Sequence, residues 1–270
     1  MTARIALAAL LIVPAAMTYP WTSTADRWLP GIAVAGSLVL FGWWRGTFVM
    51  TLIGRRVAML LRRNQKNGAH QSSDYTTVLL RVEPAGLPLP LIAGYLDRYG
   101  IRCDKIRITS RDLSGSRTTW IGITIGAADN LTALRARSPR IPLHDTAEVV
   151  GRRLANHLRE EGWDAMIVDS ADTPARPDAK ETWGGLHDGS GYVAAYRVAS
   201  LDDVASLPSS EIWMALEITG SAADLRVDRA CAIRTPGKPD QIAGATPLNG
   251  RHRLALDALN PLSVDRLIRT

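Results

Sequence analysis

Apolar residues are concentrated at the start of the chain, in two stretches separated by a short polar connector. The first stretch covers residues 5–22 and the second covers residues 28–48, with Arg45 as the one charged side chain inside them. A helix of roughly 20 mostly apolar residues crosses the hydrocarbon core of a bilayer. The pattern therefore predicts a transmembrane hairpin over residues 1–50, because membrane helices tolerate the prolines and glycines that it contains.

Aromatic and basic residues border these stretches in the way that membrane interfaces favour. The aromatic residues are Trp21 and Trp28 near the connector and Trp43 and Trp44 at the other end. The basic residues that follow the second stretch are Arg45, Arg55, Arg56, Arg62 and Arg63. Because positive residues stay on the cytoplasmic side, we expect both termini, and the large domain that follows the hairpin, in the cytoplasm.

Residues 51–74 combine apolar side chains with paired arginines and then become polar. They predict a basic juxtamembrane helix followed by a linker. Attraction of the arginines to anionic lipids, worth about 1 kcal/mol each, and control of topology by the same arginines explain the pattern equally well. Two other interpretations of the N-terminal region stay open: a cleaved signal peptide with its core at residues 5–17, and a buried helix of a water-soluble fold at residues 28–44.

From residue 75 onward, short strands alternate with helices. The clearest helix covers residues 144–161, where Ala147, Val150, Leu154 and Leu158 follow helical spacing. The other expected helices cover residues 91–99, 131–137 and 201–207, and the expected strands cover residues 75–82, 101–109, 118–125, 165–168, 193–198, 212–218 and 226–235. Residues 75–270 are therefore expected to form a mixed α/β domain in which helices flank one sheet.

Some parts of this domain are ambiguous. The strand at residues 101–109 alternates with one phase slip, and residues 169–191 resemble a loop. The last 35 residues are weakly patterned. A β-α-β-β order occurs at residues 75–125 and again at residues 193–235, and an internal duplication and a chance recurrence both explain it.

The net charge of +6 would suit a nucleic-acid partner, but it is unevenly distributed. Residues 1–66 contain eight Lys or Arg and one acidic residue, whereas residues 67–270 contain 24 Lys or Arg and 25 Asp or Glu. The excess positive charge belongs to the expected membrane segment, so no nucleic-acid partner is expected. The hydrophobic content of 46% excludes disorder of the whole chain.

The sequence contains none of the common motifs for nucleotide, zinc or nucleophile chemistry. A Walker loop, a His-Glu-x-x-His pattern, a nucleophile elbow and an Asp-x-Asp pair are all absent. The glycine-rich residues 184–191 fit a dinucleotide pattern only formally, because a strand follows them where a helix would be needed. Asp169 and Asp172 resemble turn residues, and Cys103 and Cys231 resemble buried small side chains. No catalytic, cofactor-binding or metal-binding residue is therefore predicted.

One aromatic residue of the large domain stands out. Trp183 lies in the expected loop, between a polar segment and two glycines. A tryptophan in such a position is a candidate anchor for a partner protein.

Several segments together resemble the EccE component of the ESX (type VII) secretion systems of mycobacteria and related actinobacteria. They include the two-span hairpin with Trp-Trp-Arg-Gly at 43–46 and the segments at 94–101, 146–155, 181–183 and 256–263. The similarity covers nearly the whole chain, and it is greatest to the EccE of the system linked to iron and zinc acquisition.

The resemblance implies a non-catalytic structural subunit of an inner-membrane secretion complex. Its partners in that complex would be EccB, EccC and EccD, with the lipid bilayer around the hairpin, and the complex would export small effector proteins. The family's large domain is described as similar to a glycosyltransferase fold, so a membrane-tethered enzyme with such a fold is the alternative. The missing Asp-x-Asp pair counts against that alternative, and the resemblance supplies no catalytic residue.

Overall fold

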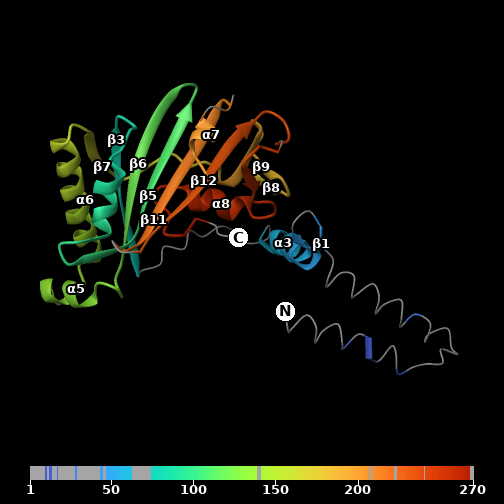
Figure 1. Ribbon diagram of the computed structural model, residues 1–270, viewed down its shortest axis with the longest axis horizontal. Helices are drawn as coiled ribbons and strands as arrows, with labels where there is room; N and C mark the ends of the chain where they lie inside the picture. Colours follow the sequence, from blue (N-terminus) through green and yellow to red (C-terminus); the bar gives the residue numbers. More distant parts are fainter. Residues whose placement is uncertain are drawn as a thin grey trace. The chain divides into compact units, whose positions relative to one another are not determined.

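The computed structural model divides the chain into two compact units, Met1–Lys66 and Asn67–Thr270 (Figure 1). It describes residues 10, 12, 13, 17, 28, 43–44, 47–62, 74–138, 141–205, 207, 209–221, 224–239 and 241–267. Nearly all of the two expected spans lies outside these residues, so the transmembrane hairpin stays a prediction. Among the residues that are described, no helix combines the length and the apolar character that a membrane crossing requires.

In the first unit, the described residues include a small strand pair followed by a helix. Strand β1 (Trp43–Trp44) pairs antiparallel with β2 (Thr47–Phe48), so these four residues at the C-terminal end of the second expected span are extended. Helix α3 (Val49–Arg62) follows directly and occupies most of the segment where the sequence predicts a basic helix.

The second unit is built around one sheet in which every recorded strand pair is antiparallel. The order across the sheet is β7-β3-β6-β5-β11-β12-β10-β9-β8, with β4 beside β5 and β13 beside β10. All of the expected strands are present. The strands are β3 (Tyr75–Glu83), β4 (Asp97–Arg98), β5 (Ile101–Leu113), β6 (Ser116–Gly126), β7 (Asp164–Val168), β8 (Lys180–Thr182), β9 (Gly185–His187), β10 (Tyr192–Val198), β11 (Glu211–Ser221), β12 (Asp224–Thr235) and β13 (Ala245–Pro247).

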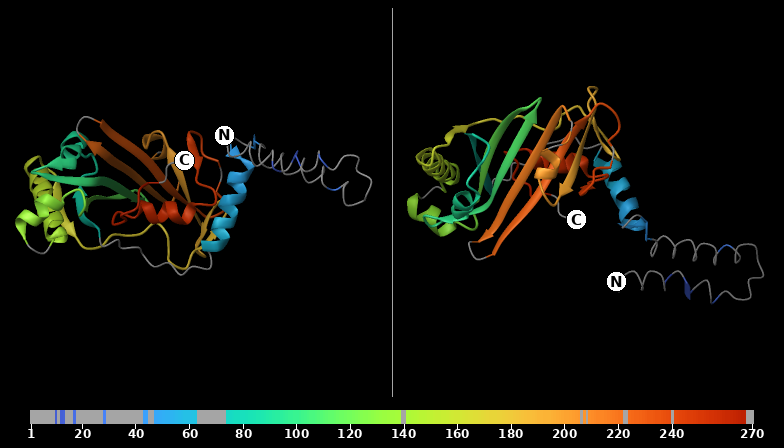
Figure 2. Two further views of the ribbon diagram at one scale, coloured as in Figure 1. Left: turned by 90° about the horizontal axis from the view of Figure 1, so that it is seen from below. Right: turned by 45° about the horizontal axis from the view of Figure 1, so that its top comes forward.

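Helices lie on both faces of this sheet, as Figure 2 shows. They are α4 (Leu89–Ala93), the 3-10 turn η1 (Gly94–Leu96), α5 (Leu131–Arg137), α6 (Leu143–Glu160), α7 (Asp202–Ala205) and α8 (His252–Leu259). The prediction of a helix at residues 91–99 is wrong beyond Leu96. There the chain forms β4 and reverses at Tyr99 and Gly100, which both have positive φ.

Two further expectations need correction. Residues 169–191 are not wholly a loop, because β8 and β9 form a hairpin whose two-residue turn is Trp183 and Gly184. The weakly patterned C-terminal residues contain β13 and α8. These elements are short, and α8 takes its place through the side chains that it buries against the sheet rather than through a long repeating pattern.

The strand order also bears on the repeated β-α-β-β pattern. β3-β6-β5 and β10-β12-β11 have the same arrangement, and they meet through the antiparallel pair β5–β11. Ile108 and Leu216 are cross-strand partners at the centre, and each lies five residues before the last residue of its strand. The two halves are thus related by an approximate two-fold axis, which favours an internal repeat over chance.

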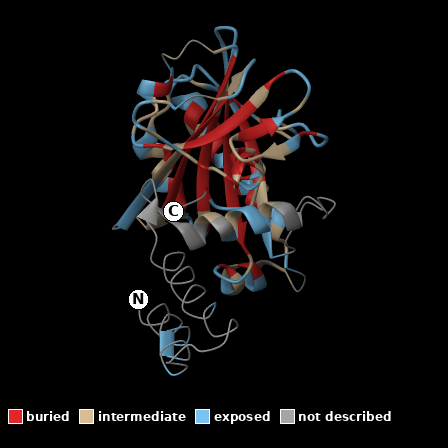
Figure 3. Ribbon diagram, turned by 90° about the vertical axis from the view of Figure 1, so that its right-hand side faces the viewer, coloured by how far each residue is buried: buried red, intermediate tan, exposed pale blue. Residues whose placement is uncertain are grey.

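The two faces of the sheet differ sharply in composition. One face carries Ile212, Met214, Leu216 and Ile218 of β11, all of them apolar, so we call it the aliphatic face. The other carries Glu211, Trp213, Ala215 and Glu217 of the same strand, and we call it the charged face. Residues of the central strands are buried on both faces, as Figure 3 shows.

The aliphatic face is covered mainly by α6, which packs on β3, β6 and β7. Its buried side chains include Ala147, Val150, Leu154 and Leu158, so the helical pattern read from the sequence is confirmed. A bulge in β5 between Cys103 and Lys105 explains the phase slip seen in the sequence. The bulge turns Cys103 toward the aliphatic core and Lys105 toward the charged face.

The charged face is covered by α8 and by residues 260–267, which we call the C-terminal segment. Gly122 of β6 permits the close approach of this segment. A Cβ atom at that position would be nearer to the carbonyl oxygen of Pro261 than real Cβ contacts allow. The segment therefore lies directly against the backbone of the sheet.

Candidate functional site: two buried ion clusters on the charged face

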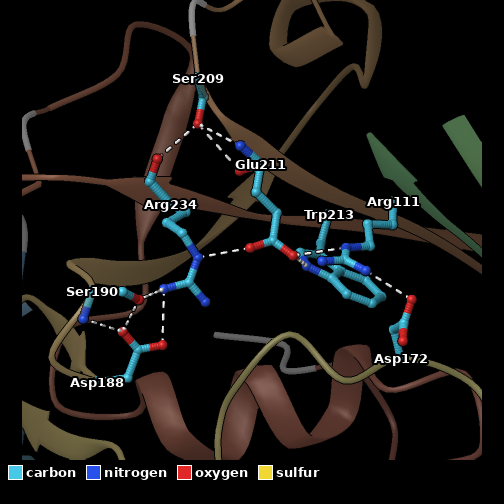
Figure 4. Close-up of polar contacts among 8 residues, drawn as sticks. All are labelled: Arg111, Asp172, Asp188, Ser190, Ser209, Glu211, Trp213 and Arg234. Atoms are coloured by element: carbon cyan, nitrogen blue, oxygen red, sulfur yellow. Dashed lines mark hydrogen bonds and ion pairs between the residues drawn. The ribbon is translucent and has the colours of Figure 1, made fainter. Parts of the chain in front are cut away.

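The first cluster surrounds Glu211 at the start of β11 (Figure 4). Its Oε1 accepts hydrogen bonds from Nε of Arg111 at 2.8 Å and from the indole nitrogen of Trp213 at 3.0 Å. Its Oε2 accepts from Nε of Arg234 at 2.7 Å. Burial raises the pKa of Glu211, but the hydrogen bonds from Arg234 and Trp213 and the nearby charges outweigh it and hold the pKa below its usual value. Glu211 therefore stays ionised.

The same arginines reach residues of the long connection between β7 and β10. Arg111 binds Asp172 at 2.7 Å, and Arg234 binds Asp188 at 2.8 Å and Ser190 at 3.1 Å. Asp172, which the sequence left as a turn residue, thus fastens this connection to the sheet. Nearby, the rings of Trp120 and Trp213 stack at 5.9 Å with an interplanar angle of 9°.

The second cluster surrounds Glu217 on the same face of β11. Arg107 donates to its Oε2 at 2.6 Å, and Nζ of Lys105 lies 3.8 Å from the same oxygen. All three side chains are at most 1% exposed. Burial, followed by the charge of Arg107, lowers the pKa of Lys105 to about 7. The cluster therefore holds two basic groups against one carboxylate in the interior.

The C-terminal segment completes this second cluster. Arg107 donates to the carbonyl oxygens of Asn260 at 3.2 Å and Ser263 at 3.1 Å, and Arg107 and Lys105 both donate to the carbonyl of Asp265. The backbone N–H of Leu267 donates to Glu217 at 3.3 Å. Backbone carbonyls of the chain end thus serve as acceptors for cations that the sheet cannot satisfy by itself.

These clusters are arranged for structure rather than for acid–base chemistry. Both carboxylates are held by several donors, and Lys105 is enclosed away from solvent. Burial raises the pKa of the Cys103 and Cys231 thiols to about 12, so neither is an activated nucleophile. Within the described residues, no group of three or more His, Cys, Asp or Glu side chains is placed to hold a metal ion.

None of the described residues that the sequence marked as membrane-interface, topology or partner-anchor candidates belongs to either cluster. Trp183 is half-buried in the β8–β9 turn, where its carbonyl oxygen accepts from the N–H of Gly250 at 3.1 Å. Trp28 is exposed, Trp43 and Trp44 form β1, and Arg55, Arg56 and Arg62 belong to α3. Trp21, Arg45 and Arg63 lie outside the described residues.

Sequence reasoning missed both clusters, although a signal was present. Glu217 lies between Leu216 and Ile218, and Arg107 lies between Ile106 and Ile108. A charged residue in the middle of an apolar strand is either exposed on one face or paired inside. The sequence does not show whether another strand supplies an oppositely charged partner, and only that partner distinguishes an exposed charge from a paired, buried one.

Comparison with known proteins places this fold in a family. A family model described as "Putative type VII ESX secretion system translocon, EccE" matches residues 113–198. The chain is 51% identical to the ESX-3 secretion system protein EccE3 of Mycolicibacterium smegmatis, over 99% of this chain and 90% of the relative. It is 48% identical to the protein of the same name from Mycobacterium tuberculosis strain H37Rv, over 98% of this chain and 86% of the relative.

The chain belongs to the EccE family. The resemblance inferred from its sequence segments is thus confirmed, including the likeness to the ESX-3 member. The family match extends from the end of β5 to the end of β10 and includes α6, Trp120, Asp172 and Asp188. The first ion cluster is therefore built partly from the segment that this EccE model recognises.

Proposed function

We propose that this EccE-family chain is a non-catalytic structural subunit of an ESX-3 type VII secretion complex in the inner membrane. Its hairpin would span the bilayer, and its large domain would contact cytoplasmic parts of EccB, EccC and EccD. The complex would export small effector proteins in support of iron and zinc acquisition. The observation that carries this proposal is the identity of 48–51% to ESX-3 EccE3 proteins over nearly the whole chain.

The geometry of the charged face supports a structural role. Two arginines and Trp213 donate to the carboxylate of Glu211. Arg107 and the backbone N–H of Leu267 donate to Oε2 of Glu217, while its Oε1 is buried without a hydrogen bond. Both carboxylates are buried, and a catalytic carboxylate needs access to a substrate proton. Every recorded strand pair is antiparallel, whereas open α/β folds bind nucleotides at the carboxyl ends of parallel strands. The alternative of a glycosyltransferase-like enzyme gains no support from either feature.

Deletion of the gene and complementation with the wild-type chain test this function. Native gels of membranes in mild detergent should show loss of the full-size complex in the deletion strain and its return on complementation. Secretion of the system's substrates and growth in iron-limited medium should follow the same pattern, and added iron should restore growth without restoring the complex. An intact complex with normal secretion in the deletion strain would refute the proposal.

Trp183 is the residue that we propose as a partner anchor within this role. Trp183→Ala removes the ring, while the backbone hydrogen bond from Gly250 to its carbonyl remains possible. We expect less of the chain in the full-size complex, at an unchanged total amount in the membrane. Trp163→Phe is the control, because it keeps an aromatic ring against the aliphatic core and gives up only the hydrogen bond from Nε1 of Trp163 to the carbonyl oxygen of Gly86. Equal recovery of Trp183→Ala and wild type would remove Trp183 from the interface.

A further inference from the structure

Aromatic and basic side chains gather where the turn between β4 and β5 meets α6. The guanidinium carbon of Arg98 lies 5.1 Å from the centre of the Tyr99 ring, and that of Arg153 lies 4.5 Å from the same centre. His157 follows Arg153 by one turn of α6. The Tyr99 ring, although contacted by both arginines, is 53% exposed. We call Arg98, Tyr99, Arg153 and His157 the arginine–tyrosine site.

The buried Tyr95 holds the side chains of this site in position. The hydroxyl of Tyr95 donates to the carbonyl oxygen of Arg153 at 3.2 Å and lies 3.3 Å from Nδ1 of His157. Arg98 approaches the same Nδ1 at 3.4 Å and also lies over the Tyr95 ring at 4.7 Å. The site is therefore preformed, because its side chains are held by one another and by the aliphatic core.

The two arginines of the site have no anionic partner in the described part of the chain. Arg152, which precedes Arg153 on α6, does have an anionic partner, because it pairs with Glu148 at 2.8 Å. The positions one helical turn before and after Arg153 are Val149 and His157, so α6 offers it no carboxylate. Two guanidinium groups against one ring keep an unbalanced positive charge, which a bound anion would neutralise.

The turn that contains Tyr99 has an unusual residue at its first position. Tyr99 and Gly100 form a two-residue turn with φ of 58° and 71°, a conformation for which Asn-Gly is strongly preferred. The comparable turn between β5 and β6 uses Ser114 and Gly115, with a small polar residue in the first position. A tyrosine in left-handed geometry is unfavourable for the backbone, so its presence indicates a use for the ring.

We propose that the arginine–tyrosine site binds an acidic segment of a partner protein, with a carboxylate held by Arg98 and Arg153 against the Tyr99 ring. Bidentate pairing between guanidinium and carboxylate groups supplies direction as well as charge. Tyrosine and arginine are the residue types enriched among the few positions that dominate protein interfaces. The proposal deepens the proposed function and rests on it, since it supposes that the large domain has protein partners.

A membrane surface fits this site less well than a protein does. Recognition of anionic lipids typically uses clusters of four to eight Lys or Arg, whereas this site contains two arginines and one histidine. Residues 67–270 carry 24 basic and 25 acidic residues, so the domain as a whole is not drawn toward an anionic bilayer or a nucleic acid.

Photo-crosslinking in the full-length protein tests the proposal. Tyr99→p-benzoylphenylalanine keeps an aromatic ring at the site, and the same substitution at the exposed Leu225 serves as the positional control. Illumination of membranes that contain the assembled complex should join position 99 to a protein segment rich in Asp or Glu. Mass spectrometry of the joined peptide identifies that segment, and position 225 should not yield the same product.

Substitutions then separate charge recognition from folding. Combined with the crosslinker at position 99, Arg153→Gln and Arg98→Gln should each reduce the crosslinked product about thirtyfold, which is the loss expected for an interface hot spot. Arg152→Gln, the matched control on the same helix, should leave the yield unchanged. In a separate chain, Tyr99→Asn should keep the melting temperature at or above that of wild type and still lose the partner, because Asn suits the turn.

The crosslinking results can contradict the proposal as well as support it. Four outcomes would each overturn the proposal: crosslinks only to lipid, crosslinks to a segment without acidic residues, equal yields from the position-99 crosslinker with and without Arg153→Gln, or no crosslink in an intact complex. If the wild-type chain co-purifies with no other membrane protein, the proposed function fails. The crosslink at position 99 in whole membranes would then still decide whether an acidic protein segment binds the site.

Discussion

The aliphatic face and the charged face of the sheet are closed in different ways. The aliphatic face is covered largely by α6, a long amphipathic helix that lies between β6 and β7 in the chain and packs against their neighbour β3. The charged face is covered by the short α8 and by the C-terminal segment, which comes from the far end of the chain. An aliphatic face accepts any well-shaped apolar cover, whereas buried cations require a cover that supplies oxygen atoms at fixed places.

The polar contacts of the charged face show what this requirement means. Arg107 makes contacts with Glu217, Asn260, Ser263 and Asp265, so one side chain joins two strands to the C-terminal segment. A buried ion pair gains little over apolar packing, because the loss of hydration offsets the attraction. We expect its clearer effect on specificity, since any other placement of the segment would remove the backbone carbonyl acceptors of Arg107 and Lys105.

Removal of the buried carboxylate should have the largest effect. Glu217→Gln leaves Arg107 and Lys105 buried without a counter-charge, and such a change typically costs about 3–5 kcal/mol of the free energy of unfolding. Urea denaturation of the full-length protein in detergent, followed by near-ultraviolet circular dichroism, measures the loss.

The control for this experiment replaces all three charges. Lys105→Met, Arg107→Met and Glu217→Leu together remove the charges while keeping apolar volume, so the triple variant should be more stable than Glu217→Gln alone. A triple variant that is less stable than Glu217→Gln would show that the arginine contacts to the C-terminal segment, and not charge balance, dominate this face.

Substitutions on the aliphatic face should lower the free energy of unfolding by a different mechanism, the loss of packing. Leu154→Ala removes a fully buried side chain from α6 and leaves a cavity, for which about 2–5 kcal/mol is typical. Leu154→Met keeps most of the volume and should cost less than about 1.5 kcal/mol. The same denaturation measurement applies, and equal losses for the two variants would contradict a closely packed helix–sheet interface.

Two glycines provide a matched comparison between the faces. Gly122→Ala places a Cβ against the rigid carbonyl of Pro261, so displacement of the C-terminal segment should cost about 1–3 kcal/mol. Gly151→Ala on α6 places a Cβ 2.8 Å from Cγ1 of the buried Val78, so α6 must shift slightly. Alanine favours the helix by roughly 0.5–1 kcal/mol, which offsets part of that cost. Limited proteolysis of the C-terminus should therefore accelerate for Gly122→Ala and not for Gly151→Ala.

The pH dependence of stability should be the smallest effect when it is compared over a single pH unit. Because burial lowers the pKa of Lys105 to about 7, the folded protein releases a proton there that the unfolded chain keeps until its ordinary value near 10.5. Unfolding then takes up a proton, so the free energy of unfolding should rise between pH 7 and pH 9, by at most about 1.4 kcal/mol per pH unit. Lys105→Met should lose this slope, and an unchanged slope would assign it to another group.

The limits of sequence reasoning follow the same division between the faces. Alternating apolar residues identified β5 and β6, and helical spacing identified α6, because burial against an apolar core imposes a period on the residues themselves. The helix expected at residues 91–99 failed because Tyr99 and Gly100 adopt left-handed geometry, which no periodicity records. The hairpin β8–β9 was missed because strands of three residues are too short to show a pattern.

The sequence by itself determined the family, the elements that cover the aliphatic face and the basic character of the first 66 residues. Only the tertiary structure decided where the buried charges go. Glu217 and Arg107 are 110 residues apart, and Arg107 and Asn260 are 153 apart, so their pairing depends on the order of the strands. Periodicity depends on near neighbours in the chain, whereas the pairing of buried ions depends on groups that only folding brings together.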